Sequence, residues 1–174
     1  MLPLLVQDAV AYLVAKMIQS KAYPFGRYLE DFQVGDVYKH WPGKTITEAE
    51  NSLFCLLTMN HHPIHLDTEF AKESQHGRIL VVGTYIFSLV VGMTVSDVSG
   101  CAIANLAYHE VAHTHPVFIG DTIYAITTVL EIQPSRSKPD RGIVKVETCA
   151  YNQSEQLVLQ FNRSVLIPRK KEGE

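Results

Sequence analysis

The chain has 174 residues, of which 47% are hydrophobic and 19% are charged, and its formal net charge is −3. This balance is typical of one globular domain and excludes a disordered chain, and the absence of a basic surplus argues against a nucleic-acid partner. The three cysteines are far apart, which favours a reducing, cytoplasmic setting over a disulfide framework or a zinc site (Cys55, Cys101 and Cys149).

Residues 1–22 are predicted to form an N-terminal extension that contains an amphipathic helix, because apolar residues recur there at helical spacing. The first cation is Lys16 and the first arginine is Arg27, which is the pattern of neither a secretory signal nor a mitochondrial transit peptide. No apolar run reaches the roughly 18–20 residues of a membrane span, so we expect no membrane partner. One domain is expected over residues 23–168, followed by a charged tail over 169–174.

Two helices are expected in the first half of this domain, after a short strand over residues 37–40 that ends at Pro42. Thr47 and Glu50 have the spacing of a capping box and predict the start of the first helix. Pro63 biases the residue before it away from helical geometry, so this helix should end before Pro63. The second helix is expected over residues 83–98, and it is apolar on nearly all sides, which indicates a central, buried position.

The second half of the chain is rich in predicted strands, over residues 102–111, 122–132, 142–151 and 157–167. Each is bounded by turn residues, and the last two alternate apolar and polar side chains, as half-buried antiparallel strands do. The predicted fold class is therefore α+β, with one buried helix against a long antiparallel sheet.

A dense group of proton-transfer side chains follows the first helix, in the segment Asn60-His61-His62-Pro63-Ile64-His65-Leu66-Asp67. A loop of this composition is a candidate site. His61 and His65 have the spacing of metal ligands on a helix, but Pro63 interrupts that helix and no cysteine completes a tetrahedral set. We therefore expect a site without metal.

The order of motifs resembles the MaoC-type hydratases over about residues 26–167. The matching pieces are the histidine segment, Gly83 at the start of an apolar helix, and the sequence Pro116-Val117-Phe118-Ile119-Gly120-Asp121 before a strand. The resemblance implies a hot-dog fold, in which a long central helix is wrapped by an antiparallel sheet. It also implies reversible addition of water to an enoyl-CoA, with no cofactor beyond the CoA of the substrate. A homodimer is expected, because a single such unit leaves a sheet edge open.

Three catalytic candidates follow from this resemblance. The family histidine falls on His65, which would move the proton of the water. The glycine whose amide stabilises the enolate falls on Gly83. The family aspartate falls on Asn60, whose amide can orient a water but cannot take its proton.

The family's asparagine before the proline is replaced by His62, and the histidine that commonly precedes the helix glycine is replaced by Val82. The form Met-Asn-x-His-Pro-x-His also resembles hydratases of short branched dicarboxylic CoA esters, of the mesaconyl- or itaconyl-CoA kind.

Further residues are candidates for binding the acyl-CoA substrate. His61 and His62 could meet a substrate carboxylate, and the basic turn of Arg136, Lys138 and Arg141 could meet a CoA phosphate. The histidines at 109, 113 and 115 lie on or beside a predicted strand. They could approach the site across a subunit interface, but no role is assigned to them. Two other functions remain open: a non-catalytic acyl-CoA-binding protein, and a hot-dog thioesterase, for which the second helix offers only Asp97 as a base.

Overall fold

One antiparallel sheet of five strands dominates the computed structural model, which describes residues 25–171. The strand order is β1-β3-β4-β5-β2. The strands are β1 (Val37–Thr45), β2 (Ala104–His113), β3 (Thr122–Pro134), β4 (Arg141–Tyr151) and β5 (Leu157–Pro168). All four strands predicted in the second half are therefore confirmed. The predicted N-terminal helix and the last three residues of the tail lie outside the described residues.

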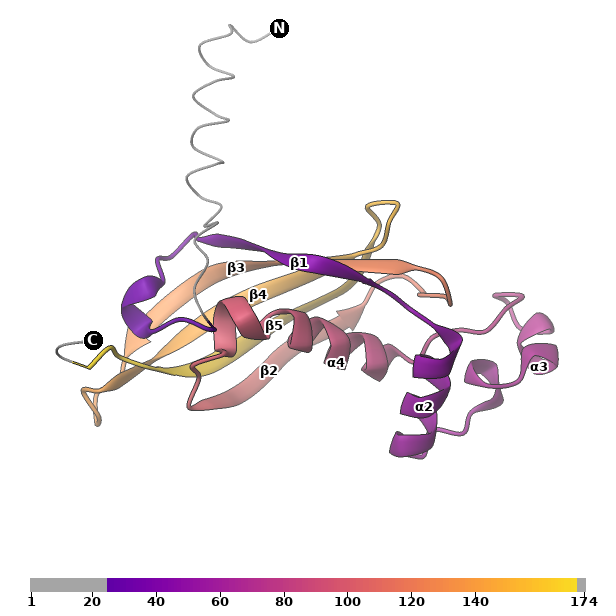
Figure 1. Ribbon diagram of the computed structural model, residues 1–174, viewed down its shortest axis with the longest axis horizontal. Helices are drawn as coiled ribbons and strands as arrows, with labels where there is room; N and C mark the ends of the chain where they lie inside the picture. Colours follow the sequence, from indigo (N-terminus) through magenta and orange to yellow (C-terminus); the bar gives the residue numbers. More distant parts are fainter. Residues whose placement is uncertain (1–24, 172–174) are drawn as a thin grey trace, which may run out of the picture.

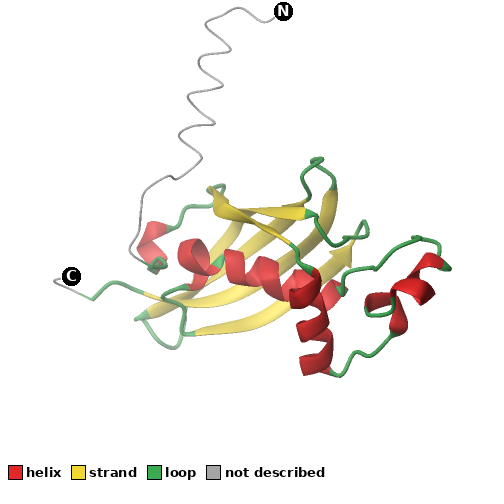
Figure 2. Ribbon diagram, turned by 45° about the vertical axis from the view of Figure 1, so that its right-hand side comes forward, coloured by secondary structure: helices red, strands yellow, loops and turns green. Residues whose placement is uncertain are grey.

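Helix α4 (Gly83–Met93) runs along one face of this curved sheet (Figures 1 and 2). Its buried residues, Ile86 and Val90, pack with Phe161 and other residues of the inner face in one hydrophobic cluster. The predicted α+β hot-dog fold, a sheet wrapped around a central helix, is confirmed. Helix α2 (Glu48–Thr58), the short turn η2 (Pro63–His65) and α3 (Thr68–Lys72) project together beyond one end of the sheet (Figure 1).

The second predicted helix is shorter and less buried than its sequence indicates. α4 ends at Met93, and a π-helical turn, η3 (Val95–Ser99), follows it. Thr94 causes this change in part, because its hydroxyl donates to the Val91 carbonyl at 2.7 Å and competes with the regular helical bond. The apolar residues on the other side of α4 are only partly buried in one copy of the chain.

Strand β1 continues through the predicted stop at Pro42 and ends at Thr45. Among residues 25–171, β1 is an edge strand that pairs with β3 alone, and its register shifts between His40 and Lys44. A proline is tolerated there, because the open edge of a sheet needs no N–H from it.

The capping box predicted at the start of α2 is present. The Thr47 hydroxyl accepts from the Glu50 N–H at 3.3 Å, and the Glu50 carboxylate accepts from the Thr47 N–H at 3.1 Å. The Lys44 ammonium and the Thr47 hydroxyl also hydrogen-bond this carboxylate and lower the pKa of Glu50 to about 2. The carboxylate is therefore charged at neutral pH, where it favours the N-terminal end of the helix dipole.

Asn51, one turn into α2, joins three segments that are distant in sequence. Its side chain is fully buried. The Asn51 Nδ2 donates to the His65 carbonyl at 2.9 Å, and the Asn51 Oδ1 accepts from the Val82 N–H at 3.0 Å. One amide therefore fixes η2 and the residue before α4 relative to α2.

Replacing Thr47 by alanine should lower the free energy of unfolding by about 1 kcal/mol, because the Glu50 N–H loses its cap. Chemical denaturation measures this change. Thr47→Ser keeps the hydroxyl and should remain close to the wild type, and equal losses in both variants would show that the cap does not stabilise α2.

Replacing Asn51 by leucine should cost more, about 2 kcal/mol or above, because the Val82 N–H and the His65 carbonyl lose their partner inside the protein. The same denaturation experiment applies, with Ser52→Ala as the control at the neighbouring position of α2. An Asn51→Leu protein as stable as the control would contradict the joining role of this amide.

Candidate active site

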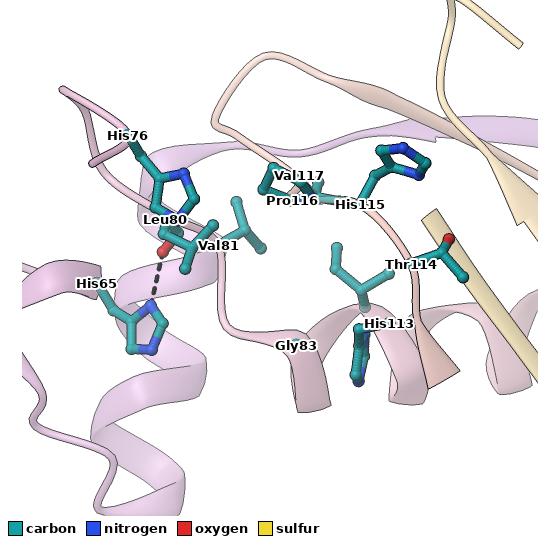
Figure 3. Close-up of a pocket in the computed structure, with 11 residues that line it drawn as sticks. His65, His76, Leu80, Val81, Gly83, His113, Thr114, His115, Pro116 and Val117 are labelled. Carbon is teal, nitrogen blue, oxygen red and sulfur yellow. Dashed lines mark hydrogen bonds between the residues drawn. The ribbon is translucent and has the colours of Figure 1, made fainter. Parts of the chain in front are cut away.

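A pocket of about 290 Å³ lies where the start of α4 meets η2 and the end of β2 (Figure 3). Histidines and apolar residues from these segments line it: His65, His76, Leu80, Val81, Gly83, Ile86, His113, Thr114, His115, Pro116 and Val117. The pocket therefore contains two of the three predicted catalytic residues, His65 and Gly83.

Two backbone contacts bring the walls of this pocket together. The Leu80 N–H donates to the Ile64 carbonyl at 3.2 Å, and the Val81 N–H donates to the Val117 carbonyl at 2.9 Å. The segment before α4 thus pairs with η2 on one side and with the chain after β2 on the other. This pairing brings the segments around residues 65, 83 and 115 together around the pocket.

His65 is held in one tautomer by the backbone. Its Nδ1–H donates to the Leu80 carbonyl at 2.7 Å (Figure 3). The other ring nitrogen, Nε2, then carries the lone pair of the neutral ring and can accept a proton. A histidine fixed in this way is suited to general-base chemistry.

Gly83 is the first residue of α4 and contributes an amide to the pocket. The first N–H groups of a helix have no partner within the helix and lie at the positive end of its dipole. A Cβ at this position would lie 3.1 Å from Nε2 and Cε1 of His113, so a larger residue would need a small shift of the His113 ring. The start of α4 can therefore receive a negatively charged oxygen.

The remaining polar residues of the histidine segment lie outside the residues that line the pocket. The Asn60 Oδ1 accepts from the His62 N–H at 3.4 Å, a contact within the loop itself. His61 and His62 are both exposed, and the His62 ring lies 6.0 Å from the His65 ring, centroid to centroid. Asp67 caps α3 by accepting from the N–H groups of Glu69 and Phe70, as expected of a bracing residue.

The basic turn predicted to bind CoA lies at the opposite end of the sheet from α2 and the pocket (Figures 1 and 2). Arg136 and Lys138 are exposed in the connection between β3 and β4, and Arg141 pairs with Asp140 at 2.8 Å. Within one copy of the chain these cations are not brought to His65. Their predicted contact with CoA remains a prediction.

Four residues of this region were not found by sequence reasoning. His76, His113 and His115 line the pocket although sequence reasoning assigned them no role, and Asn51 positions its walls. The sequence does contain a signal for the histidines at 113 and 115, because they lie between the predicted strand over residues 102–111 and the matched motif that begins at Pro116. The long-range bonds of Asn51 have no local sequence signal.

The electrostatic character of the pocket follows from its lining. None of the eleven lining residues is an aspartate, glutamate, lysine or arginine, while four are histidines. Desolvation by the surrounding protein lowers the pKa of His113, so its imidazole is neutral at neutral pH.

Among the described residues, no group of three His, Cys, Asp or Glu side chains is arranged to hold a metal ion. No described helix combines the length and apolar character needed to cross a membrane.

The sequence of the chain is similar to those of several known proteins. A mesaconyl-CoA hydratase of Cereibacter sphaeroides is 34% identical over 145 residues, which are 83% of this chain and 42% of the relative. A β-methylmalyl-CoA dehydratase of Chloroflexus aurantiacus is 30% identical over 177 residues, covering 92% of this chain and 50% of the relative. The chain thus spans about half the length, or less, of these curated relatives.

The structural comparison agrees. The crystal structure of a putative MaoC domain protein dehydratase from Chloroflexus aurantiacus superposes with a TM-score of 0.82 at 28% identity, covering 90% of this chain and 44% of that one. The model of the MaoC like domain matches residues 31–152, from the last residue of the short turn η1 (Leu29–Asp31) to just past the end of β4. The chain therefore belongs to the MaoC-like domain family.

Proposed function

We propose that the pocket at the start of α4 adds water reversibly to the double bond of an enoyl-CoA, so that the protein is a hydro-lyase. One observation carries this proposal: a histidine with a free Nε2 and a helix N-terminus line the same pocket. The first can take a proton from water, and the second can stabilise the charge that develops on a thioester oxygen. The names of the relatives, a hydratase and a dehydratase, support the same reaction.

The proposed steps balance without an added cofactor. His65 Nε2 takes one proton from water as the water oxygen bonds to C3 of the enoyl group. The electron pair of the double bond moves to the thioester oxygen, and the resulting enolate is held by the Gly83 N–H. The proton on His65 then returns to C2, which regenerates the neutral imidazole.

Although Asn60 is not among the residues that line the pocket, the role proposed for it is to hold the attacking water once substrate is bound. Because the Asn60 Oδ1 accepts from the backbone of its own loop, the contact with water would come from the Nδ2 group. An amide donor of this kind orients the water oxygen but leaves proton transfer to His65.

The proposed substrate class is a short branched dicarboxylic enoyl-CoA. Mesaconyl-CoA and β-methylmalyl-CoA, which name the two relatives, are thioesters with a second carboxylate. A pocket lined by four histidines and no carboxylate offers no repulsion to this group.

The homodimer is proposed from the edge of the sheet. Within the described part of one copy, β2 pairs with β5 alone, so its other edge is open there. Apolar side chains on and beside this strand are exposed, including Ile103, Leu106, Tyr108 and Val111. A second copy could cover both features, and the sedimentation coefficient of the protein tests this.

The cytoplasmic location expected from the sequence remains a prediction.

A thioesterase has less support from the geometry. The carboxylate offered by the sequence, Asp97, lies in η3 beyond the C-terminal end of α4. It accepts from His40 Nδ1 at 2.8 Å and faces the buried Arg27 at 3.9 Å, so it is engaged away from the pocket.

Replacing His65 by alanine should reduce the hydration of crotonyl-CoA and mesaconyl-CoA by about 10²- to 10⁴-fold, because the general base is lost. Loss of the enoyl-thioester absorbance measures the rate, and a thiol reagent detects any release of free CoA. His109→Ala is the control, since His109 contacts Ser164 and lies outside the pocket lining.

Three outcomes would count against the proposal. Near-normal hydration by His65→Ala would remove His65 from the mechanism. Release of free CoA by the wild type would indicate a thioesterase, and binding without either reaction would indicate a binding protein.

A further inference from the structure

His113 differs from the other three histidines of the pocket in the state of its ring nitrogens. Hydrogen bonds of 2.7 Å tie His65 Nδ1 to the Leu80 carbonyl and His115 Nδ1 to the Leu157 carbonyl. The Gln75 amide donates to His76 Nε2 at 3.2 Å. Among residues 25–171, neither ring nitrogen of His113 has a hydrogen-bond partner. Its imidazole is therefore available to a ligand.

The His113 ring also lies directly beside the predicted oxyanion position. A Cβ on Gly83 would be 3.1 Å from His113 Nε2, so the ring lies close to the first residue of α4. Figure 3 shows the start of α4 at Gly83 between the His65 ring and the His113 ring in that view. When one oxygen of a ligand accepts a hydrogen bond from the Gly83 N–H, a second polar group a few bonds away in the same ligand can therefore reach the His113 ring.

The charge of the pocket favours an anion at this point. The lining contains no carboxylate to repel one, and the N-terminus of α4 is the positive end of the helix dipole. Desolvation by the surrounding protein lowers the pKa of His113 below its ordinary value, which favours the neutral ring with one N–H to donate. A bound carboxylate would favour the protonated ring and convert this contact into a charge-assisted hydrogen bond.

We propose that His113 binds the free carboxylate of a dicarboxylic acyl-CoA while the thioester oxygen lies at the Gly83 N–H. This inference rests on the proposed function in one respect, that the pocket accepts an acyl-CoA thioester. It assigns the preference for a second carboxylate to a residue on the end of β2, outside the histidine segment. His65 performs the proton transfer, and His113 selects the substrate.

Binding of two saturated thioesters tests this assignment without any turnover. Succinyl-CoA and butyryl-CoA have the same number of acyl carbons, but only succinyl-CoA ends in a carboxylate, and neither has a double bond to hydrate. Titration calorimetry should show that the wild type binds succinyl-CoA more tightly. His113→Leu should reduce this preference about ten- to a hundredfold, the range for a hydrogen bond to a charged group.

Two further variants make the result specific. His113→Gln retains a side-chain N–H donor and should keep part of the preference for succinyl-CoA. His109→Leu changes another exposed histidine of β2 and should leave the preference unchanged. Circular dichroism confirms that each variant is folded, and the glutamine variant carries the test should the leucine variant fail to fold.

Equal affinity of the wild type for the two thioesters would overturn the proposal, and so would an equal loss of both affinities in the His113 variants. Crotonyl-CoA hydration, measured in parallel, separates this proposal from the proposed function. Hydration without a preference for succinyl-CoA removes only the role of His113. A preference that depends on His113, without hydration, removes only the proposed reaction.

Discussion

The geometry of the pocket depends on one buried amide. Asn51 donates to the His65 carbonyl and accepts from the Val82 N–H, and its side chain is fully buried. A buried backbone group that loses its partner costs about 1–3 kcal/mol, so conformations without the two Asn51 hydrogen bonds are less stable. The base on η2 and the amide at the start of α4 come from different elements, and Asn51 fixes both to α2.

The fold explains why the start of α4 remains accessible while its middle is buried. Ile86 and Val90 pack on the inner face of the sheet, and this packing holds the helix in place. Its first turn lies at the end of the sheet from which α2 and α3 project (Figure 1), and its first residue, Gly83, lines the pocket there. The packing of α4 on the sheet stabilises the fold, and the residues proposed to react lie at one end of the sheet.

Much of this arrangement was predictable, because the features involved are local in sequence. Thr47 and Glu50 form their capping box three residues apart, and the alternating side chains of β4 and β5 give strands with nearly the predicted bounds. The extension of β1 past Pro42 was not predictable, since it depends on β1 being an edge strand. The bond between Asn51 and Val82 and the proximity of His113 to Gly83 join segments about 30 residues apart, and no local pattern encodes them.

The central claim is that one pocket holds both the proton acceptor and the oxyanion donor. A crystal structure of the protein with butyryl-CoA, which cannot be hydrated, tests it most directly. The account predicts the thioester oxygen within hydrogen-bond distance of the Gly83 N–H, with His65 Nε2 facing the third acyl carbon. An acyl group bound elsewhere, such as the hollow beside Tyr124 and Tyr151 on the sheet, with the His65 pocket empty, would contradict it.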